Sequence, residues 1–255
     1  MLEPSSNALT FYHVENSTMA ELAQHQFTLF TLLQQREQEF GFNPQTIVHY
    51  PQAQFLTSPV DYLHHFLTDL AQQDEVINQV VILTTWDILE APLLQAGYER
   101  EAIHMPADPD NTAIFRQQLN NVPEGKTLYI EAVDEQDPKI RPTFVLVLRN
   151  EHGEILGGMS GSIWEQGKTR YAYIGTVVVQ PQLRAGTGMM LANSVLDYLR
   201  EQHVYEVNLG TQTAEAFYAQ LGFKSIHHIV TALRHRTDKN GQTVPHNLVI
   251  MSKHL

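Results

Sequence analysis

The second half of the chain contains an apolar strand-length segment, a turn with two glycines and an amphipathic helix in direct succession. Residues 174–179 form the apolar segment, the turn contains Gly186 and Gly188, and the helix is predicted over residues 189–202. Glycines at alternate positions let the backbone approach a ligand closely, and the helix directs its first N–H groups and a partial positive charge toward that ligand. We therefore expect an anion-binding turn that holds a phosphate or pyrophosphate.

Two better-known glycine motifs do not fit this turn. Leu191 stands where the dinucleotide-binding fingerprint has its third glycine, and no Gly-Lys-Ser/Thr sequence follows, as a P-loop requires. Arg184, which precedes the glycines, adds a fixed positive charge beside the expected anion.

Apolar periodicity and turn residues predict alternating strands and helices along the chain. A long helix that includes Leu22 and Leu33 is expected after a cap at Asn16 and Ser17. Further helices are predicted at residues 60–70, 88–95, 112–119, 189–202 and 214–221, and strands at residues 9–14, 46–49, 55–56, 80–84, 127–133, 144–149, 155–163, 171–179, 204–209, 226–233 and 247–251. This order predicts an α/β (α+β) fold around one mixed sheet.

Acidic residues are concentrated in the first half of the chain. Residues 1–105 contain 13 Asp and Glu but only 2 Arg, whereas the rest contains 15 acidic and 14 basic residues, which gives net charges of −11 and −1. The change falls at residues 106–111, where two prolines disfavour helix and strand. We therefore predict a domain at residues 1–105, a linker at 106–111 and a second domain at 112–255. A surface loop within one domain is the alternative.

Composition excludes several classes of function. The net charge of −12 argues against nucleic-acid binding, which needs clustered Lys and Arg. No cysteine is present, so a disulfide framework and a thiol nucleophile are excluded. The pairs His64-His65 and His227-His228 point apart and no His-Glu-x-x-His occurs, so no metal site is expected. The sequence begins without signal-peptide character and its apolar stretches are too short to span a bilayer, so we expect a soluble cytoplasmic protein with no membrane partner.

The two halves of the chain resemble each other at an offset of 125 residues. Residues 80–83 fall on residues 205–208, and Glu90-Ala91, Gln95 and Gly97-Tyr98 fall on Glu215-Ala216, Gln220 and Gly222-Phe223. A strand, a helix and a glycine–aromatic exit therefore recur without a gap. We interpret this as two related lobes in tandem, and chance similarity of two strand–helix units is the alternative.

A second motif follows the glycine turn and its helix. Residues 204–223 read as a strand, a turn and a short helix that ends in Phe217-Tyr218, two further residues and Leu221-Gly222-Phe223. The glycine turn followed by this motif resembles the GNAT superfamily of N-acetyltransferases. The resemblance covers residues 111–255 and is strongest over residues 177–223. It implies a GNAT-like mixed central sheet flanked by helices, with acetyl-CoA as co-substrate.

The same resemblance implies roles for individual residues. Tyr218 matches the tyrosine that commonly protonates the departing thiolate. Two positions depart from the family pattern, because Thr211 stands where an Asn is frequent and Gly175 where many relatives carry a carboxylate base. A third departure lies in the glycine loop, where the family usually has Gln or Arg at the first place. Counting back from Gly186 puts Leu183 there, and Arg184 fits that place only if the loop is one residue shorter. The implied acetyl-CoA contacts are Val177, Val178, Val179, Arg184, Ala185, Gly186, Thr187, Gly188, Met189, Thr211 and Phe217.

The expected function is an acetyl-CoA-dependent N-acetyltransferase that moves an acetyl group to a primary amine by direct transfer in a ternary complex. The alternative is a non-catalytic acyl-CoA-binding sensor on the same fold. The general base is left open among Tyr173, His152, Glu131, Glu165 and a chain of water molecules. Trp164 and Tyr171 either line an acceptor pocket or serve packing.

The first half lacks the features on which this function depends. Leu93 aligns with Tyr218, and no glycine turn precedes the helix at residues 60–70. We therefore expect a catalytically inert, degenerate GNAT-like lobe that shapes the acceptor cleft. Its charge of −11 either favours a cationic acceptor, whether a small amine or a protein, or serves only solubility. The sequence leaves open whether the chain forms a homodimer.

Overall fold

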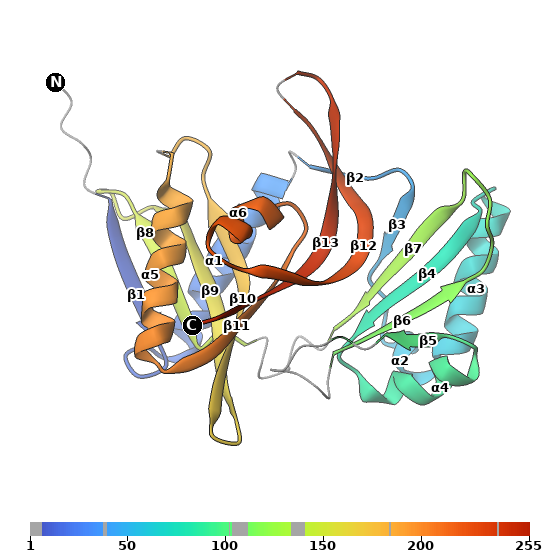
Figure 1. Ribbon diagram of the computed structural model, residues 1–255, viewed down its shortest axis with the longest axis horizontal. Helices are drawn as coiled ribbons and strands as arrows, with labels where there is room; N and C mark the ends of the chain where they lie inside the picture. Colours follow the sequence, from blue (N-terminus) through green and yellow to red (C-terminus); the bar gives the residue numbers. More distant parts are fainter. Residues whose placement is uncertain are drawn as a thin grey trace. The chain divides into compact units, whose positions relative to one another are not determined.

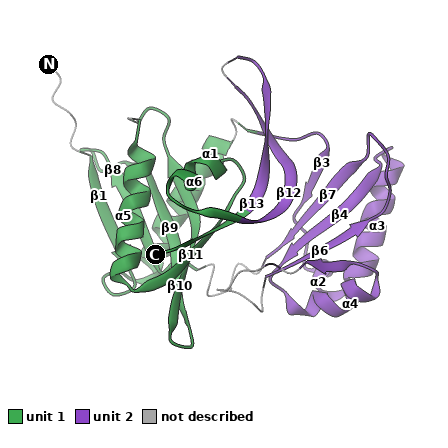
Figure 2. Ribbon diagram, viewed as in Figure 1, with its two compact units in different colours: residues 1–40, 135–225, 250–255 green, residues 41–134, 226–249 purple. Residues whose placement is uncertain are grey.

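The computed structural model describes residues 7–37, 40–101, 103, 112–133, 141–183, 185–238 and 240–255. The predicted linker at residues 106–111 and the predicted ligand residue Arg184 lie outside the described residues. The chain forms two compact units (Figure 2). Unit 1 consists of Met1–Phe40, Glu135–Ser225 and Ile250–Leu255, and unit 2 consists of Gly41–Asp134 and Ile226–Val249.

The two units divide the chain differently from the predicted domain boundary. Residues 1–40, expected in the first domain, group with residues 135–225. The reason is that β1 (Ala8–His13) pairs antiparallel with β8 (Phe144–Arg149). Residues 112–134, expected in the second domain, belong to unit 2. Charge and proline content mark a change in composition, but they do not indicate which distant strand a segment joins.

The larger sheet is mixed and has the strand order β1-β8-β9-β10-β11-β13-β12-β2 (Figure 1). From β1 to β10 the neighbours run antiparallel, whereas β10 and β11 are parallel. A right-handed crossover helix between β10 and β11 is the usual way to join two such strands. The remaining bounds are β9 (Ile155–Gln166), β10 (Thr169–Val179), β11 (Val204–Thr211), β13 (Thr243–His254), β12 (Lys224–Thr237) and β2 (Gly41–Phe42).

Two helices cover opposite faces of this sheet. The helix α1 (Met19–Glu37) packs its buried leucines against Val145 of β8. The helix α5 (Thr187–Glu201) reaches β8 at Phe144, whose ring centroid lies 5.6 Å from that of Tyr198. Because successive residues of a strand point to opposite faces, α1 and α5 lie on different sides (Figure 1).

A capping box at Thr18 starts α1. The Thr18 N–H donates to the Glu21 carboxylate at 2.8 Å, and the Glu21 N–H donates to the Thr18 hydroxyl at 3.2 Å. Asn16 instead accepts the N–H of His13 at 2.9 Å in the preceding turn. The predicted cap at Asn16 and Ser17 is therefore corrected to Thr18.

Unit 2 contains a five-stranded sheet of order β3-β7-β4-β6-β5. Strands β3, β7 and β4 are parallel, and β6 is antiparallel to both of its neighbours. Its core packs apolar side chains of the helices, such as Leu63 and Leu93, against Val80 and Ile82 of β4. The bounds are β3 (Thr46–His49), α2 (Gln54–Thr57), α3 (Pro59–Gln72), β4 (Ile77–Thr84), the 3₁₀ helix η1 (Asp87–Leu89), α4 (Glu90–Gln95), β5 (Glu99–Glu101), β6 (Ala113–Gln118) and β7 (Lys126–Ala132).

Two structural expectations were wrong. The predicted helix at residues 112–119 is strand β6, because this segment finds partners on both edges, β4 and β5. The predicted strand at residues 55–56 lies in the short helix α2, which buries Phe55. The predicted mixed α/β class is confirmed, and the strands form two sheets flanked by helices.

The 125-residue repeat corresponds to a repeat of local structure. In both copies a buried strand, β4 or β11, leads into a short helix, α4 or α6 (Glu215–Gln220). The glycines that follow, Gly97 and Gly222, have φ of 85° and 84°. The residue after each glycine donates its N–H to the carbonyl five residues back, at 3.0 Å in unit 2 and 3.1 Å in unit 1. The two halves therefore share one strand–helix–glycine path.

Candidate active site

Strands β10 and β11 separate toward their carboxyl ends. Their parallel pairing ends at Ile174, opposite Leu209, whereas β10 continues to Val179 and remains paired with β9. In the described chain, the edge of residues 175–179 that faces β11 therefore has no partner strand, and its backbone groups are available to a ligand. Three of the implied acetyl-CoA contacts lie here, namely Val177, Val178 and Val179.

Gly175 lies where the two strands part. The pairing of β10 with β9 shifts between Ile174 and Thr176, so Gly175 is an extra, bulged residue. It is exposed, and a Cβ built on it would meet nothing closer than the ring of Tyr173 at 3.9 Å. The point of separation is thus open and carries no side chain.

The helix α5 begins at this end of β10, in a conformation that requires glycine. Gly186, its N-cap residue, has a φ of 91°, in the left-handed region. Gly188 follows in the first turn, where a Cβ would lie 3.5 Å from Phe217 and 3.9 Å from Val179. The positive end of the helix therefore adjoins the unpaired edge of β10, as an anion-binding turn requires.

Tyr218 of α6 is buried among aromatic rings. Its side chain is 5% exposed, and its ring centroid lies 5.1 Å from that of Phe217 and 5.7 Å from that of Phe223. Burial raises the pKa of Tyr218, and the nearby Tyr173 raises it further. The phenol therefore stays protonated at neutral pH and is a hydrogen-bond donor. Phe217 joins this phenol to Gly188, and so to the turn before α5.

Comparison with known proteins identifies this arrangement. Residues 111–223 match the model of the acetyltransferase (GNAT) family. This segment matches a GNAT acetyltransferase domain. A comparison with curated proteins gives no match.

Several solved structures are similar to part of this chain, each over 44% of its length. Arabidopsis thaliana Naa50 in complex with a bisubstrate analogue is 22% identical, with 72% of that chain covered and a TM-score of 0.34. Ard1 from Thermoplasma volcanium is 23% identical, with 70% covered and a TM-score of 0.34. An acetyltransferase from Bacillus cereus ATCC 14579 is 22% identical, with 71% covered and a TM-score of 0.33.

The predicted cofactor residues of the GNAT domain lie around the start of α5 and the end of β10. Ala185 and Gly186 are exposed, and Thr187, Gly188 and Met189 are half-buried. Thr211, the last residue of β11, accepts the N–H of Ala214 on its hydroxyl at 3.0 Å. Its oxygen therefore holds the turn that leads into α6.

The structure separates the four candidate bases. Tyr173 directly precedes Ile174, where the pairing of β10 with β11 ends, and its charge raises the pKa of Tyr218. Glu165 has a side chain 60% exposed and forms an ion pair with Arg170 at 2.8 Å. His152 is 74% exposed, on the turn between β8 and β9. Glu131 belongs to β7 of unit 2. Tyr173 is the candidate that lies where β10 and β11 stop pairing.

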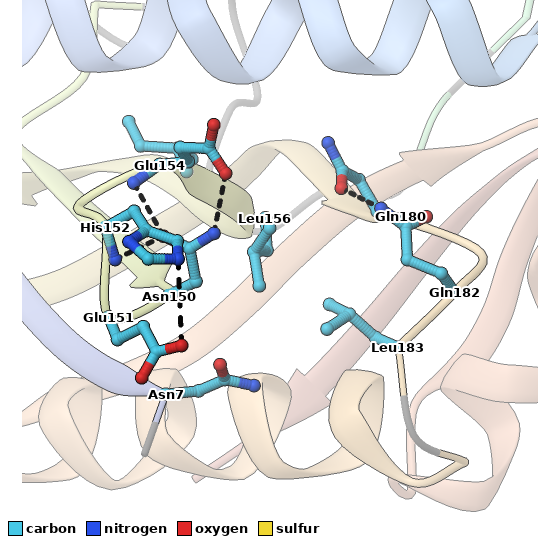
Figure 3. Close-up of a pocket in the computed structure, with 10 residues that line it drawn as sticks. Asn7, Asn150, Glu151, His152, Glu154, Leu156, Gln180, Gln182 and Leu183 are labelled. Carbon is cyan, nitrogen blue, oxygen red and sulfur yellow. Dashed lines mark hydrogen bonds and ion pairs between the residues drawn. The ribbon is translucent and has the colours of Figure 1, made fainter. Parts of the chain in front are cut away.

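A cavity of about 580 Å³ adjoins the loop between β10 and α5 (Figure 3). Its polar lining comes from the β8–β9 turn, with Glu151, His152 and Glu154, and from the loop residues Gln180 and Gln182. Neither Tyr173 nor Tyr218 lines it. The cavity therefore lies apart from Tyr173 and Tyr218, and so does His152, which lines it.

Sequence reasoning missed two buried polar residues on β11. Glu206 is 1% exposed and Asn208 is 0% exposed. The signal was present in the sequence, because these residues alternate with the apolar Val207 and Leu209 and so define a polar face of a strand. Trp164 and Tyr171, considered for an acceptor pocket, stack with centroids 6.2 Å apart on the adjoining strands β9 and β10.

Two further findings apply only to the residues that the structure describes. No group of three or more His, Asp or Glu side chains is placed to hold a metal ion. None of the helices has the length and apolar character needed to cross a membrane.

Proposed function

We propose that this chain is an acetyl-CoA-dependent N-acetyltransferase that transfers the acetyl group directly to a primary amine in a ternary complex. The observation that carries the proposal is the end of the β10–β11 pairing at Ile174, beside the glycine N-cap of α5 and the buried Tyr218. An unpaired strand edge suits an amide-bearing arm, and a helix N-terminus suits a diphosphate. The family match of residues 111–223 supports the same activity.

The residues present fit acetyl-CoA. The edge at Val177, Val178 and Val179 would accept the pantetheine arm, and the turn from Ala185 to Met189 would hold the diphosphate. Arg184 and Thr211 remain predicted contacts, as does Phe217. The coenzyme would supply an activated acyl group, since a thioester needs little more than a well-placed uncharged amine. Backbone N–H groups near the Gly175 bulge would stabilise the negative charge that develops on the acyl oxygen.

Tyr218 would be the general acid in this proposal. Its protonated phenol supplies a donor at neutral pH, and its packing between Phe217 and Phe223 fixes its direction. A positioned acid contributes about 10²–10⁴-fold to the rate of such a step. Substitution of Tyr218 therefore tests directly whether this residue acts in the transfer step rather than in acetyl-CoA binding.

A non-catalytic acyl-CoA sensor is the second candidate. It is favoured by Gly175, which leaves the bulge of β10 without the carboxylate that many relatives carry. Such a protein would bind acetyl-CoA but release no CoA in the presence of amines.

Unit 2 supports the proposal of a degenerate GNAT-like lobe. Its β3, β4, β6 and β5 follow the relative order of β10, β11, β13 and β12, and β7 lies between β3 and β4. With this correspondence, β7 lies between the two strands of unit 2 that match β10 and β11, and it pairs along the edge whose counterpart in unit 1 stays unpaired beyond Ile174. Leu93, at the position that aligns with Tyr218, is fully buried in the apolar core. The unit would therefore bind no coenzyme.

The acidic first half suggests a cationic acceptor, either a small amine or a protein surface. A cytoplasmic location and a homodimer stay predictions.

Calorimetry with acetyl-CoA and assays of CoA release test the proposed function. We expect one molecule of acetyl-CoA to bind per chain and a higher melting temperature in its presence. CoA release is then measured with a polyamine, an aminoglycoside and lysine-containing peptides as acceptors. Binding without turnover on any amine would favour the sensor, and no binding would exclude both readings.

A further inference from the structure

One face of β11 carries a row of buried polar residues, Glu206 and Asn208, which we call the polar file. Glu206 and Asn208 are 1% and 0% exposed and point to the same face, because alternate residues of a strand share a side. Gly210 is the next residue on that face. Carboxylates are almost never fully buried in proteins unless they are paired or perform a task.

The file is incompletely hydrogen-bonded. Ser252 of β13 donates its hydroxyl to Oε1 of Glu206 at 2.8 Å. Within the described part of the chain, Oε2 of Glu206 has no hydrogen-bond partner, and neither do the amide oxygen and nitrogen of Asn208. A buried group without a partner destabilises a fold by about 1–3 kcal/mol, so a purely structural network would be expected to be satisfied. The open positions instead suit groups that exchange hydrogen bonds during a reaction.

Strand register connects the file to the buried phenol. Tyr173 of β10 is opposite Asn208, and Tyr171 is opposite Glu206. A Cβ built on Gly210 would lie 3.1 Å from the hydroxyl oxygen of Tyr173, which places that hydroxyl on the face of the file. Tyr173 directly precedes Ile174, where the pairing of β10 with β11 ends beside the proposed coenzyme site. The polar file therefore begins at the reacting end of the site.

The other end of the file reaches solvent. His254 of β13 has a side chain 64% exposed, and its Nδ1 lies 3.7 Å from Oε2 of Glu206. Among the described residues, this histidine is the ionisable side chain that lies near Glu206, and Tyr171 of β10 is opposite Glu206 in the strand register. Residues two apart on a strand are separated by about 7 Å, a span that one side chain and one water molecule bridge.

We propose that Glu206 receives the proton released by the acceptor amine, through Tyr173 and water held by Asn208, and returns it to solvent through His254. This inference rests on the proposed function. The acceptor ammonium gives one proton to the relay, and the resulting amine attacks the acyl carbon. As the new C–N bond forms, the C–S bond breaks and the thiolate takes a proton from Tyr218. The remaining excess proton on nitrogen restores the phenol, so the net product of the relay is one proton in solvent.

The test compares two acceptors in Glu206→Gln. Gln keeps the shape of the side chain and an oxygen for Ser252, but it takes up no proton. With the most active alkylamine, we expect kcat to fall by at least about 100-fold near neutral pH and to recover as pH rises, because solvent then supplies the uncharged amine. Hydroxylamine is already uncharged at neutral pH and needs no relay. Its kcat should change less than about threefold.

His254→Asn provides a second variant whose folding is not in question, because the side chain is largely exposed. It should lower kcat for the alkylamine and leave the KM for acetyl-CoA unchanged. Glu201→Gln is the matched control, since Glu201 is an exposed carboxylate at the end of α5. It should behave as wild type with both acceptors.

Four results would count against the relay. Equal losses with alkylamine and hydroxylamine would assign Glu206 a structural role, and so would an unchanged pH profile. Wild-type kinetics in Glu206→Gln would remove it from the reaction while leaving the proposed function intact. A wild-type protein that turns over neither acceptor would overturn the proposed function and the relay together.

Discussion

Gly188 faces the ring of Phe217 at a distance that leaves room for one methyl group. A Cβ on Gly188 would lie 3.5 Å from Cε2 of Phe217, which is ordinary van der Waals contact. The fold alone therefore does not demand glycine here, whereas a ligand that approaches the backbone of this turn would.

Gly188→Ala separates these two demands. Ala is more favourable than Gly in a helix, by up to about 1 kcal/mol in the interior, and Gly188 lies in the first turn, so the variant should melt at or slightly above the wild-type temperature. Acetyl-CoA affinity should fall at least about tenfold, because a difference of roughly 1.4 kcal/mol is expected when a methyl group blocks the diphosphate. Calorimetry and a thermal melt measure both quantities. Wild-type affinity would place the coenzyme elsewhere.

Gly186→Ala should show the opposite pattern for stability. The φ of 91° at Gly186 is unfavourable for any residue with a Cβ, so the variant should lose about 1–2 kcal/mol of unfolding free energy. Urea denaturation of the coenzyme-free protein measures this loss. Because nothing lies within 4 Å of the Cβ position, a loss cannot be attributed to a steric clash. Unchanged stability would show that the turn relaxes to another conformation.

Tyr218→Phe removes the phenolic hydroxyl and preserves the ring contacts with Phe217 and Phe223. We expect kcat to fall by about 10²–10⁴-fold, with acetyl-CoA affinity and the melting temperature close to wild type. Burial raises the pKa of Tyr218, so the wild-type rate should not decline up to pH 9 through ionisation of this group. Steady-state kinetics at several pH values provide the measurement. A variant with full kcat would exclude Tyr218 as the acid.

Tyr98 makes the stability of unit 2 sensitive to alkaline pH. Burial raises the pKa of Tyr98 from 10.0 to about 12. Its contribution to stability is fully present below pH 10, where the phenol is neutral in both states, and is lost as pH rises toward 12, because the unfolded chain ionises first. The loss approaches about 3 kcal/mol, since each pKa unit corresponds to about 1.4 kcal/mol. Urea unfolding between pH 9 and 11.5 should show a steeper decline for wild type than for Tyr98→Phe, and parallel declines would contradict the prediction.

Glu101 ties β5 to two other strands of unit 2. Its carboxylate accepts a hydrogen bond from Arg116 of β6 and lies 2.9 Å from Nε2 of His227 of β12. Burial raises the pKa of Glu101, but the Arg116 and His227 contacts outweigh it, and the pKa is lowered overall. The stabilisation is present above the ordinary carboxylate pKa and is lost as pH falls through the lowered value. Glu101→Gln should lose about 1–2 kcal/mol of unfolding free energy at pH 7 and less near pH 3. A loss that does not depend on pH would indicate packing rather than charge.

Local features of the site could be predicted from the sequence, because they depend on neighbouring residues. The left-handed conformation of Gly186 and the glycine exit at Gly222 follow from turn chemistry a few residues long. The capping residue was placed one position early, since Ser17 and Thr18 are both good caps and only the position of Glu21 distinguishes them.

Features that depend on distant partners could not be predicted in the same way. The segment now seen as β6 contains residues that also favour a helix, and only its pairing with β4 and β5 settles its structure. Strand β1 belongs to unit 1 because it pairs with β8, and the whole of Gly41–Asp134 of unit 2 separates these two strands in the sequence. The polar file of Glu206 and Asn208 was readable as an alternating pattern, but its unsatisfied hydrogen bonds become visible only in three dimensions.

The pairing of Ala8 with Arg149 has a consequence for biosynthesis. The ribosome releases the first strand of unit 1 well before its partner, and makes the whole of Gly41–Asp134 in between. Unit 2 in turn waits for Ile226–Val249, which emerge after most of unit 1. Neither unit completes its strand pairs until nearly the entire polypeptide has been made, so a nascent chain of this protein carries unpaired strand edges for most of its translation.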